Sequence, residues 1–179
     1  MGENDQESFM SGSWIGRRLA AIAGSAAIMM LAGAVCATAE EAHGIEITGA
    51  AVTTGTMTPD GLSRLPAVEQ EVRYRTSKGE EGGRYKGPLL WSVLEARGIA
   101  DLPGHNAQLK HSFVVEGRDG YRIVFSVGEI DPDFGNAPIQ LATERDGKAT
   151  VPEEGYRLVV PGDKRGARHV RDVVKIEVK

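Results

Sequence analysis

The stretch that most constrains the fold is residues 156–178, YRLVVPGDKRGARHVRDVVKIEV. An apolar run opens the stretch and ends at Pro161 and Gly162, a pair that favours a turn because proline fixes φ and glycine tolerates a positive φ. The stretch closes with apolar residues at every second position from Val174 to Val178, which is the period of a half-buried strand. We therefore expect two strands on either side of one loop.

That loop, residues 162–171, concentrates positive charge in a chain that is acidic as a whole. The chain has 21 basic and 25 acidic residues and a net charge of −4. Gly162 and Gly166 let backbone N–H groups approach an oxyanion, and arginine forks match the geometry of a phosphate. The pattern indicates an anion pocket, and the alternative is a solvated surface loop, as charge runs usually are. The basic residues of the loop are Lys164, Arg165, Arg168 and Arg171.

Length and composition limit the other possibilities. The 179 residues suit one domain, and 41% hydrophobic and 26% charged residues are ordinary for a globular protein. The net acidic charge argues against nucleic-acid binding, and the few aromatic residues are not interleaved with the basic ones as in a stacking platform.

The amino end has the features of an export signal. Basic Arg17 and Arg18 precede the small apolar residues 19–35, and residues 37–39 form an A-x-A cleavage site. We expect residues 1–39 to be a cleaved signal peptide, which places the product in the periplasm or outside the cell. An uncleaved membrane anchor is the alternative, and the twin arginines leave the Sec and Tat routes both open.

Cleavage would leave a single domain over residues 40–179 and would remove Cys36, the only cysteine. A mature domain without cysteine has no disulfide and no thiolate metal ligand, so its stability must come from packing.

The periodicity of the mature part predicts a mixed α+β domain, rich in strands and with short helices. We expect a strand over residues 69–76, then an exposed polar loop over residues 77–83. A helix is expected with its cap at Gly87 and its end at Gly98. Further strands are expected near residues 46–48, 113–115, 121–125, 138–142 and 158–160, with a short helix opening at Ser126.

The residues alone point to no enzyme class. The sequence contains no Walker loop, dinucleotide fingerprint or G-x-S-x-G motif. His43, His105, His111 and His169 lack the spacing of a metal site, and Arg168 and Arg171 flank His169 with positive charge. We expect no metal site built from protein side chains alone.

Several segments together resemble the molybdopterin-binding domain of the sulfite-oxidase superfamily in its short exported bacterial form. They are RYKGPLLWSVLEARGI (84–99), VVEGRDGYRIVFSVGEID (114–131), IQLATERDGKATVPEEGYRLVVPGD (139–163) and RGARHVRDVVKIEV (165–178). The resemblance implies that family's strand-rich α+β fold and binding of molybdopterin, a pterin that carries a phosphate and a dithiolene-held molybdenum. The cofactor-binding residues that it implies are Gly162, Lys164, Arg165, Arg168, His169 and Arg171, with Arg118 and Tyr121 on a hairpin turn.

One departure from the family pattern bears on chemistry. Active members hold molybdenum with a cysteine thiolate, which would fall near residues 73–77, and this segment contains no cysteine. A serine or threonine hydroxyl does not replace a soft thiolate. Two functions follow: a molybdopterin-dependent oxidoreductase or cofactor-binding subunit with a periplasmic or membrane electron-transfer partner, or a non-catalytic module that binds another anion or a protein.

Overall fold

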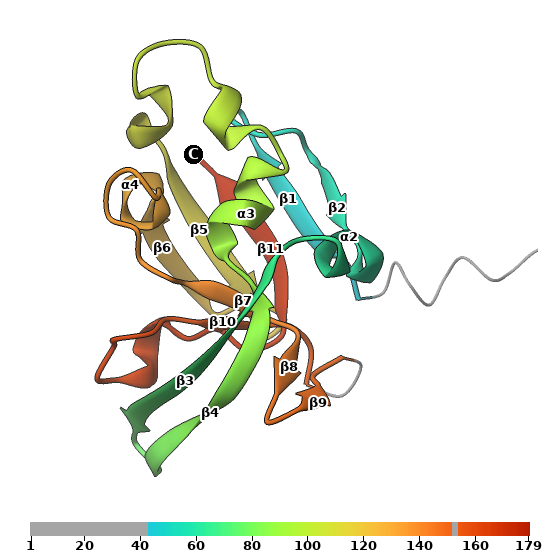
Figure 1. The fold of residues 1–179 in the computed structure, drawn as a ribbon, viewed down its shortest axis with the longest axis vertical. Coiled ribbons are helices and arrows are strands. Elements are labelled where there is room, and N and C mark those ends of the chain that lie inside the picture. The colour runs from blue at the N-terminus through green and yellow to red at the C-terminus, as the bar shows by residue number, and fades with distance from the viewer. Residues whose placement is uncertain (1–42, 152–153) are drawn as a thin grey trace, which may run out of the picture. The chain divides into compact units, whose positions relative to one another are not determined.

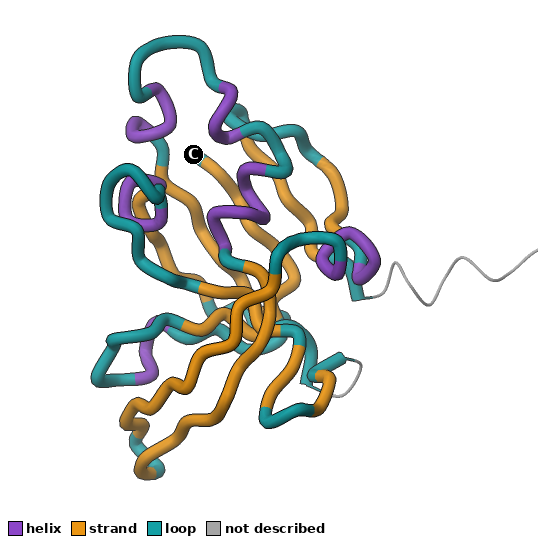
Figure 2. The backbone as a smooth tube through the Cα atoms, viewed as in Figure 1, coloured by secondary structure: helices purple, strands orange, loops and turns teal. Residues whose placement is uncertain are grey.

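The computed structural model describes residues 43–151 and 154–179. The expected signal peptide, its cleavage site and Cys36 lie outside these residues. Strands make up most of the regular secondary structure of the described chain, and its helices are short (Figure 2). No helix in this part has the length and apolar character needed to span a membrane.

A five-stranded sheet in the order β2-β1-β11-β5-β6 forms one layer (Figure 1). β1 and the last strand, β11, run parallel to each other at its centre, and the other neighbours are antiparallel. The sheet is therefore complete only when β11, the last strand in the sequence, lies between β1 and β5. The strands are β1 (Ile45–Gly49), β2 (Gly55–Met57), β5 (Ser112–Gly117), β6 (Arg122–Ser126) and β11 (Val173–Val178).

Helix α3 (Leu90–Glu95) covers one face of this sheet (Figure 1). Its buried Leu90, Val93 and Leu94 belong to the same apolar cluster as Ile47 and Ile176 of the central strands, so burial of this face stabilises the larger core. The remaining helical turns are α2 (Pro59–Ser63), α4 (Val127–Ile130) and the 3-10 turns η1 (Ile99–Asp101), η2 (Ala107–Lys110) and η3 (Gly166–Arg168).

A long hairpin extends away from this core (Figure 1). Strands β3 (Ala67–Thr76) and β4 (Gly79–Pro88) pair along their whole length. β8 (Glu144–Arg145) pairs with β4, and β9 (Lys148–Ala149) pairs with β8, which gives a four-stranded sheet. β7 (Gln140–Ala142) pairs with β10 (Arg157–Val159) beneath the hairpin. A small second core lies here and contains Val72, Tyr74, Tyr85, Ala142 and Val159.

The expected polar loop over residues 77–83 was wrong. Gly79 already begins β4, and the turn is only Ser77 and Lys78. Glycine suits this strand because a side chain at Gly82 would meet the Val72 carbonyl oxygen at 2.4 Å. A polar, glycine-rich composition here reflects close strand pairing rather than a mobile loop.

Two further expectations identified an element correctly, but one misplaced its N-terminal cap and the other misjudged which of its residues are buried. Helix α3 ends before Gly98, whose φ of +91° is the left-handed value expected of a helix end, but its cap is Leu89, not Gly87. In β11 a bulge shifts the register between Val173 and Lys175, so that Val173 is buried and Val174 only partly so. Single-sequence alternation cannot reveal such a bulge.

Gly87 is the position where the two cores meet most tightly. A Cβ at this residue would lie 2.1 Å from the backbone carbonyl oxygen of Leu141 in β7. We expect Gly87→Ala to lower the free energy of unfolding by about 3 kcal/mol, because backbone must move. In Gly83→Ala on the same strand, the new methyl would meet only the flexible side-chain ends of Asp146 and Arg145, at 3.1 and 3.2 Å. Equal urea midpoints for the two variants would contradict this description of the junction.

Candidate functional site

The basic loop folds back onto β10, and the pairing decides which of its side chains meet. The Leu158 N–H donates to the Val170 carbonyl at 2.8 Å and the Val170 N–H donates to the Leu158 carbonyl at 3.3 Å. Both of these residues are in the larger core. Side chains alternate along extended backbone, so Arg157, His169 and Arg171 share the opposite face, toward the hairpin.

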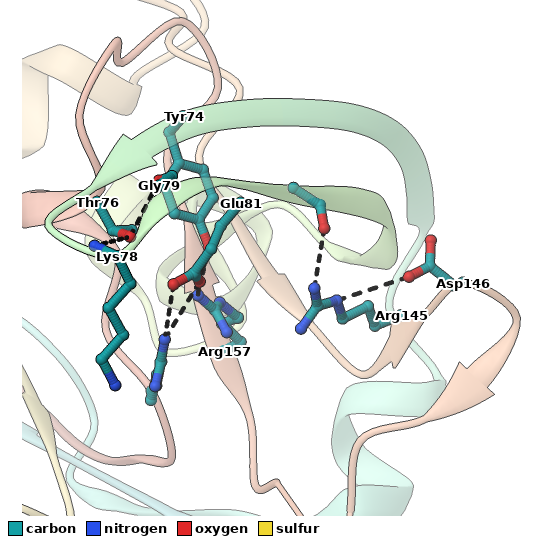
Figure 3. A network of polar contacts seen from close by, with 10 residues as sticks. Tyr74, Thr76, Lys78, Gly79, Glu81, Arg145, Asp146 and Arg157 are labelled. Carbon is teal, nitrogen blue, oxygen red and sulfur yellow. Dashed lines mark hydrogen bonds and ion pairs between the residues drawn. The ribbon is translucent and has the colours of Figure 1, made fainter.

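The hairpin presents a polar face to these residues (Figure 3). Tyr74 of β3 is in register with Glu81 of β4, and Tyr85 of β4 is in register with Arg145 of β8. Side chains paired in register lie on the same face. The Arg145 guanidinium lies 5.6 Å from the centre of the Tyr85 ring.

Arg157 is the buried centre of this arrangement. The residue is 7% exposed, and its Nη2 donates a hydrogen bond to the Tyr74 hydroxyl and lies 3.8 Å from a Glu81 carboxylate oxygen. Its guanidinium is 5.8 Å from the centre of the Tyr85 ring, and its Nε has no hydrogen-bond partner. A buried cation with an unmet donor is costly, and a bound anion or an ordered water would satisfy the free Nε–H.

His169 is the second buried group without a partner. It is 6% exposed, its ring centre lies 4.0 Å from that of Tyr74, and neither ring nitrogen has a hydrogen-bond partner. Burial, reinforced by the charge of Arg157, lowers the pKa of His169 to about 4. At neutral pH the ring therefore offers one donor and one acceptor.

Glu81 and Arg171 lie beside the hydroxyl end of Tyr74. The Tyr74 hydroxyl donates to Glu81 Oε2 at 3.3 Å, and Arg171 Nη2 lies 3.2 Å from the same oxygen. Burial raises the pKa of Tyr74 to about 12, so the phenol stays protonated. Burial alone would raise the pKa of Glu81, but Arg171, the Tyr74 hydroxyl and Arg157 outweigh it and hold that pKa below the usual value.

A cavity of about 280 Å³ opens at this cluster and is lined by Arg145, Glu154, Arg157 and Arg171. The lining holds three guanidinium groups and one carboxylate, and Glu81 pairs with Arg157 and Arg171 at the cluster; arginine forks of this kind can bind an anion. A larger cleft of about 510 Å³ carries mainly carboxylates and has the wrong sign for a phosphate; it is lined by Glu71, Arg73, Glu80, Glu81, Gly82, Gly83, Arg84 and Asp146.

Arg168, expected among the cofactor ligands, is already neutralised within the protein. It forms two hydrogen bonds to Asp163, at 2.7 and 2.8 Å, and a third to Glu129 at 2.7 Å. Its guanidinium also lies 5.4 Å from the centre of the Phe125 ring. The hydrogen bonds from Arg168 lower the pKa of Asp163. These contacts tie the loop to α4, so in this structure the residue positions the loop.

The structure places the other predicted residues in different parts of the molecule. Arg171 lines the cavity and His169 is buried against the Tyr74 ring, whereas Lys164 and Arg165 are exposed, without an ion pair in the described part of the chain. Arg118 pairs with Asp172 at 2.6 Å, and the Tyr121 hydroxyl donates to a loop carbonyl at 2.6 Å. Gly162 has the positive φ, +90°, that its turn requires.

Sequence reasoning missed the residues on which the cavity depends most. Arg157 was not among the predicted residues, although a lone arginine directly before the apolar run Leu158–Val160 is itself a signal. Tyr74, Glu81 and Arg145 carry no such signal, because only the register of the hairpin brings them together.

The donor set offers little to a metal. Within residues 43–151 and 154–179, no group of three or more His, Cys, Asp or Glu side chains could hold a metal ion. In the segment expected to carry a thiolate, the Tyr74 hydroxyl is engaged by Arg157 and Glu81, and the Thr76 hydroxyl donates to the Gly79 carbonyl at 3.1 Å.

No protein-family model and no curated protein matches the chain. Among solved structures, it is similar to the sulfane dehydrogenase SoxCD from Paracoccus pantotrophus, with a TM-score of 0.62 and 19% identity. The match covers 77% of this chain and 38% of that one, so this chain spans well under half of the protein that it resembles. A likeness at this identity shows the fold, and it confirms the predicted strand-rich α+β class.

The burial of neutral His169 makes stability depend on pH. Its pKa is about 4 in the folded protein and about 6.5 in the unfolded chain, so the unfolded state takes up the proton first as pH falls. We expect His169 to cost up to roughly 1.4 kcal/mol of unfolding free energy per pH unit from pH 6.5 toward 4. Urea unfolding between pH 7 and 5, above the range of Glu81 and Asp163, measures this slope. It should shrink in His169→Gln but not in His105→Gln, and an unchanged slope in the first variant would contradict the burial.

Proposed function

We propose that the chain binds a molybdopterin-type cofactor, with the anionic end of the ligand in the cavity against Arg157. One observation carries the proposal: Arg157 lines a cavity rich in arginine and is buried with an Nε that has no hydrogen-bond partner. A phosphate oxygen would accept a hydrogen bond from Arg157 Nε. The fold supports the proposal because it resembles that of a dehydrogenase.

The residues fit the phosphate of such a cofactor better than its metal. Arg145, Arg157 and Arg171 would hold the phosphate, and neutral His169 could donate to it or to a pterin nitrogen. The protein supplies no thiolate in the segment of residues 73–77. Molybdenum would therefore be held by the dithiolene of the cofactor alone.

When bound, the cofactor would supply the transfer of an oxygen atom or of two electrons. The role of the protein's own residues would be to bind it and to exclude water, with Tyr74 protonated beside the anion. The proposal includes export through residues 1–39 and an electron-transfer partner in the periplasm or the membrane.

A second function, a non-catalytic anion-binding module, is favoured by one specific observation. The hydroxyls of Tyr74 and Thr76, in the segment expected to hold the metal, are engaged within the protein. In this alternative the same cavity would hold a different anion.

Cofactor content tests the proposal directly. Full-length protein purified from its native host is analysed for molybdenum and for pterin fluorescence after oxidation, and we expect about one pterin per chain. Arg171→Gln keeps the buried cluster and should lower pterin retention about tenfold, since it removes a charge-assisted hydrogen bond. Arg122→Gln, which breaks ion pairs with Glu116 and Glu177 on the far sheet, is the matched control and should retain the pterin.

The outcomes separate the two functions. Loss of pterin in Arg171→Gln alone supports the cofactor proposal. Folded, exported protein without pterin, which still binds phosphate in the cavity, supports the anion-binding module. Protein that binds neither overturns both.

A further inference from the structure

Arg75 and Arg165 are unlike the other arginines of the described chain. Every other arginine between residues 43 and 179 forms an ion pair or donates a hydrogen bond to another residue, as Arg73 does to Glu71 at 2.6 Å and Arg97 to the Thr56 carbonyl at 2.6 Å. The side chains of Arg75 and Arg165 do neither, and both residues are exposed. In a net acidic protein, two unpaired guanidinium groups point to a binding site only if they lie close together.

They do lie together, because the basic loop adds to the free edge of β3. The Arg75 N–H donates to the Lys164 carbonyl at 3.0 Å, and Arg75 and Arg165 form a parallel bridge. Residues bridged in this way have side chains on the same face and backbones only about 4.8 Å apart. The fold therefore holds these two like charges on one face; Glu80 of β4 is the cross-strand neighbour of Arg75, but neither arginine forms an ion pair within the described residues.

Close packing fixes this arrangement. A Cβ on Gly166 would lie 2.7 Å from the Tyr74 ring, so only glycine lets the loop approach β3 here. Arg168 clamps the next turn of the loop to Asp163 and Glu129. The separation of the two free arginines is thus set by backbone and ring contacts.

The two arginines line a cleft of about 480 Å³ that has no carboxylate in its lining, which is Arg75, Thr76, Ser77, Arg165, Gly166 and Ala167. None of these residues lines the Arg157 cavity. Tyr74 lies between the two sites, because its ring touches Gly166 while its hydroxyl bonds Arg157. The cleft is therefore separate from the cavity of the proposed function.

We propose that this cleft is a second anion-binding site, for a small phosphomonoester. A phosphomonoester carries a charge of about −1.5 to −2 at pH 7, which matches two guanidinium groups, whereas a carboxylate brings only one negative charge. The volume exceeds that of a phosphate group and leaves room for the attached organic part over Gly166 and Ala167.

Titration of the full chain with phenyl phosphate tests the proposal, with arginine Nε–Hε resonances as the readout. We expect the signals of Arg75 and Arg165 to shift together and to saturate with one dissociation constant. Arg75→Gln and Arg165→Gln should each weaken binding about tenfold. Arg73→Gln is the matched control, because it removes a charge from the same face of β3 that is already paired with Glu71, and it should change binding less than about twofold.

Separate signals keep the two sites distinguishable, since Arg157 and Arg171 report the cavity. Unsaturated shifts of all exposed arginines would show simple charge screening and would overturn the second site. So would acetate binding as tightly as phenyl phosphate at equal ionic strength, or equal losses in Arg73→Gln and Arg75→Gln.

Discussion

The contact between the Arg157 guanidinium and the Tyr74 hydroxyl is the interaction on which the functional end of the molecule depends. Tyr74 belongs to the long hairpin and Arg157 to the strand before the basic loop, so the contact joins elements far apart in the sequence. The same tyrosine ring packs against His169 and against Gly166. One side chain therefore fixes the loop, covers the buried cation and separates the two candidate anion sites.

The charged residues of the basic loop are not the same as the charged residues that have unused hydrogen-bond donors for a ligand. Arg168 is one of the anion ligands expected from the sequence, but each of its three guanidinium nitrogens already donates a hydrogen bond to Asp163 or Glu129. Arg157 lies outside the loop and is buried with an unmet donor. The net effect is a loop whose paired arginine holds it in place while other cations remain open to ligands.

The sequence predicted most of the strands and the fold class because these follow from periodicity and turn residues. The hairpin turn at Gly120, the helix end at Gly98 and the strand up to Thr76 are local features, and the structure has them. The cavity could not be predicted in the same way. It arises from the pairing of Leu158 with Val170 and of Tyr74 with Glu81, and no single-sequence pattern encodes such long-range registers.

The central claim is that Arg157 is buried in order to bind an anion. A crystal of the protein soaked in tungstate tests it most directly, because the anomalous signal of tungsten locates the oxyanion without any assumption about the cofactor. We expect a peak in the cavity between Arg145, Arg157 and Arg171, within hydrogen-bond distance of Arg157 Nε. A map without a peak there, with Arg157 Nε bonded to another protein atom, would contradict it.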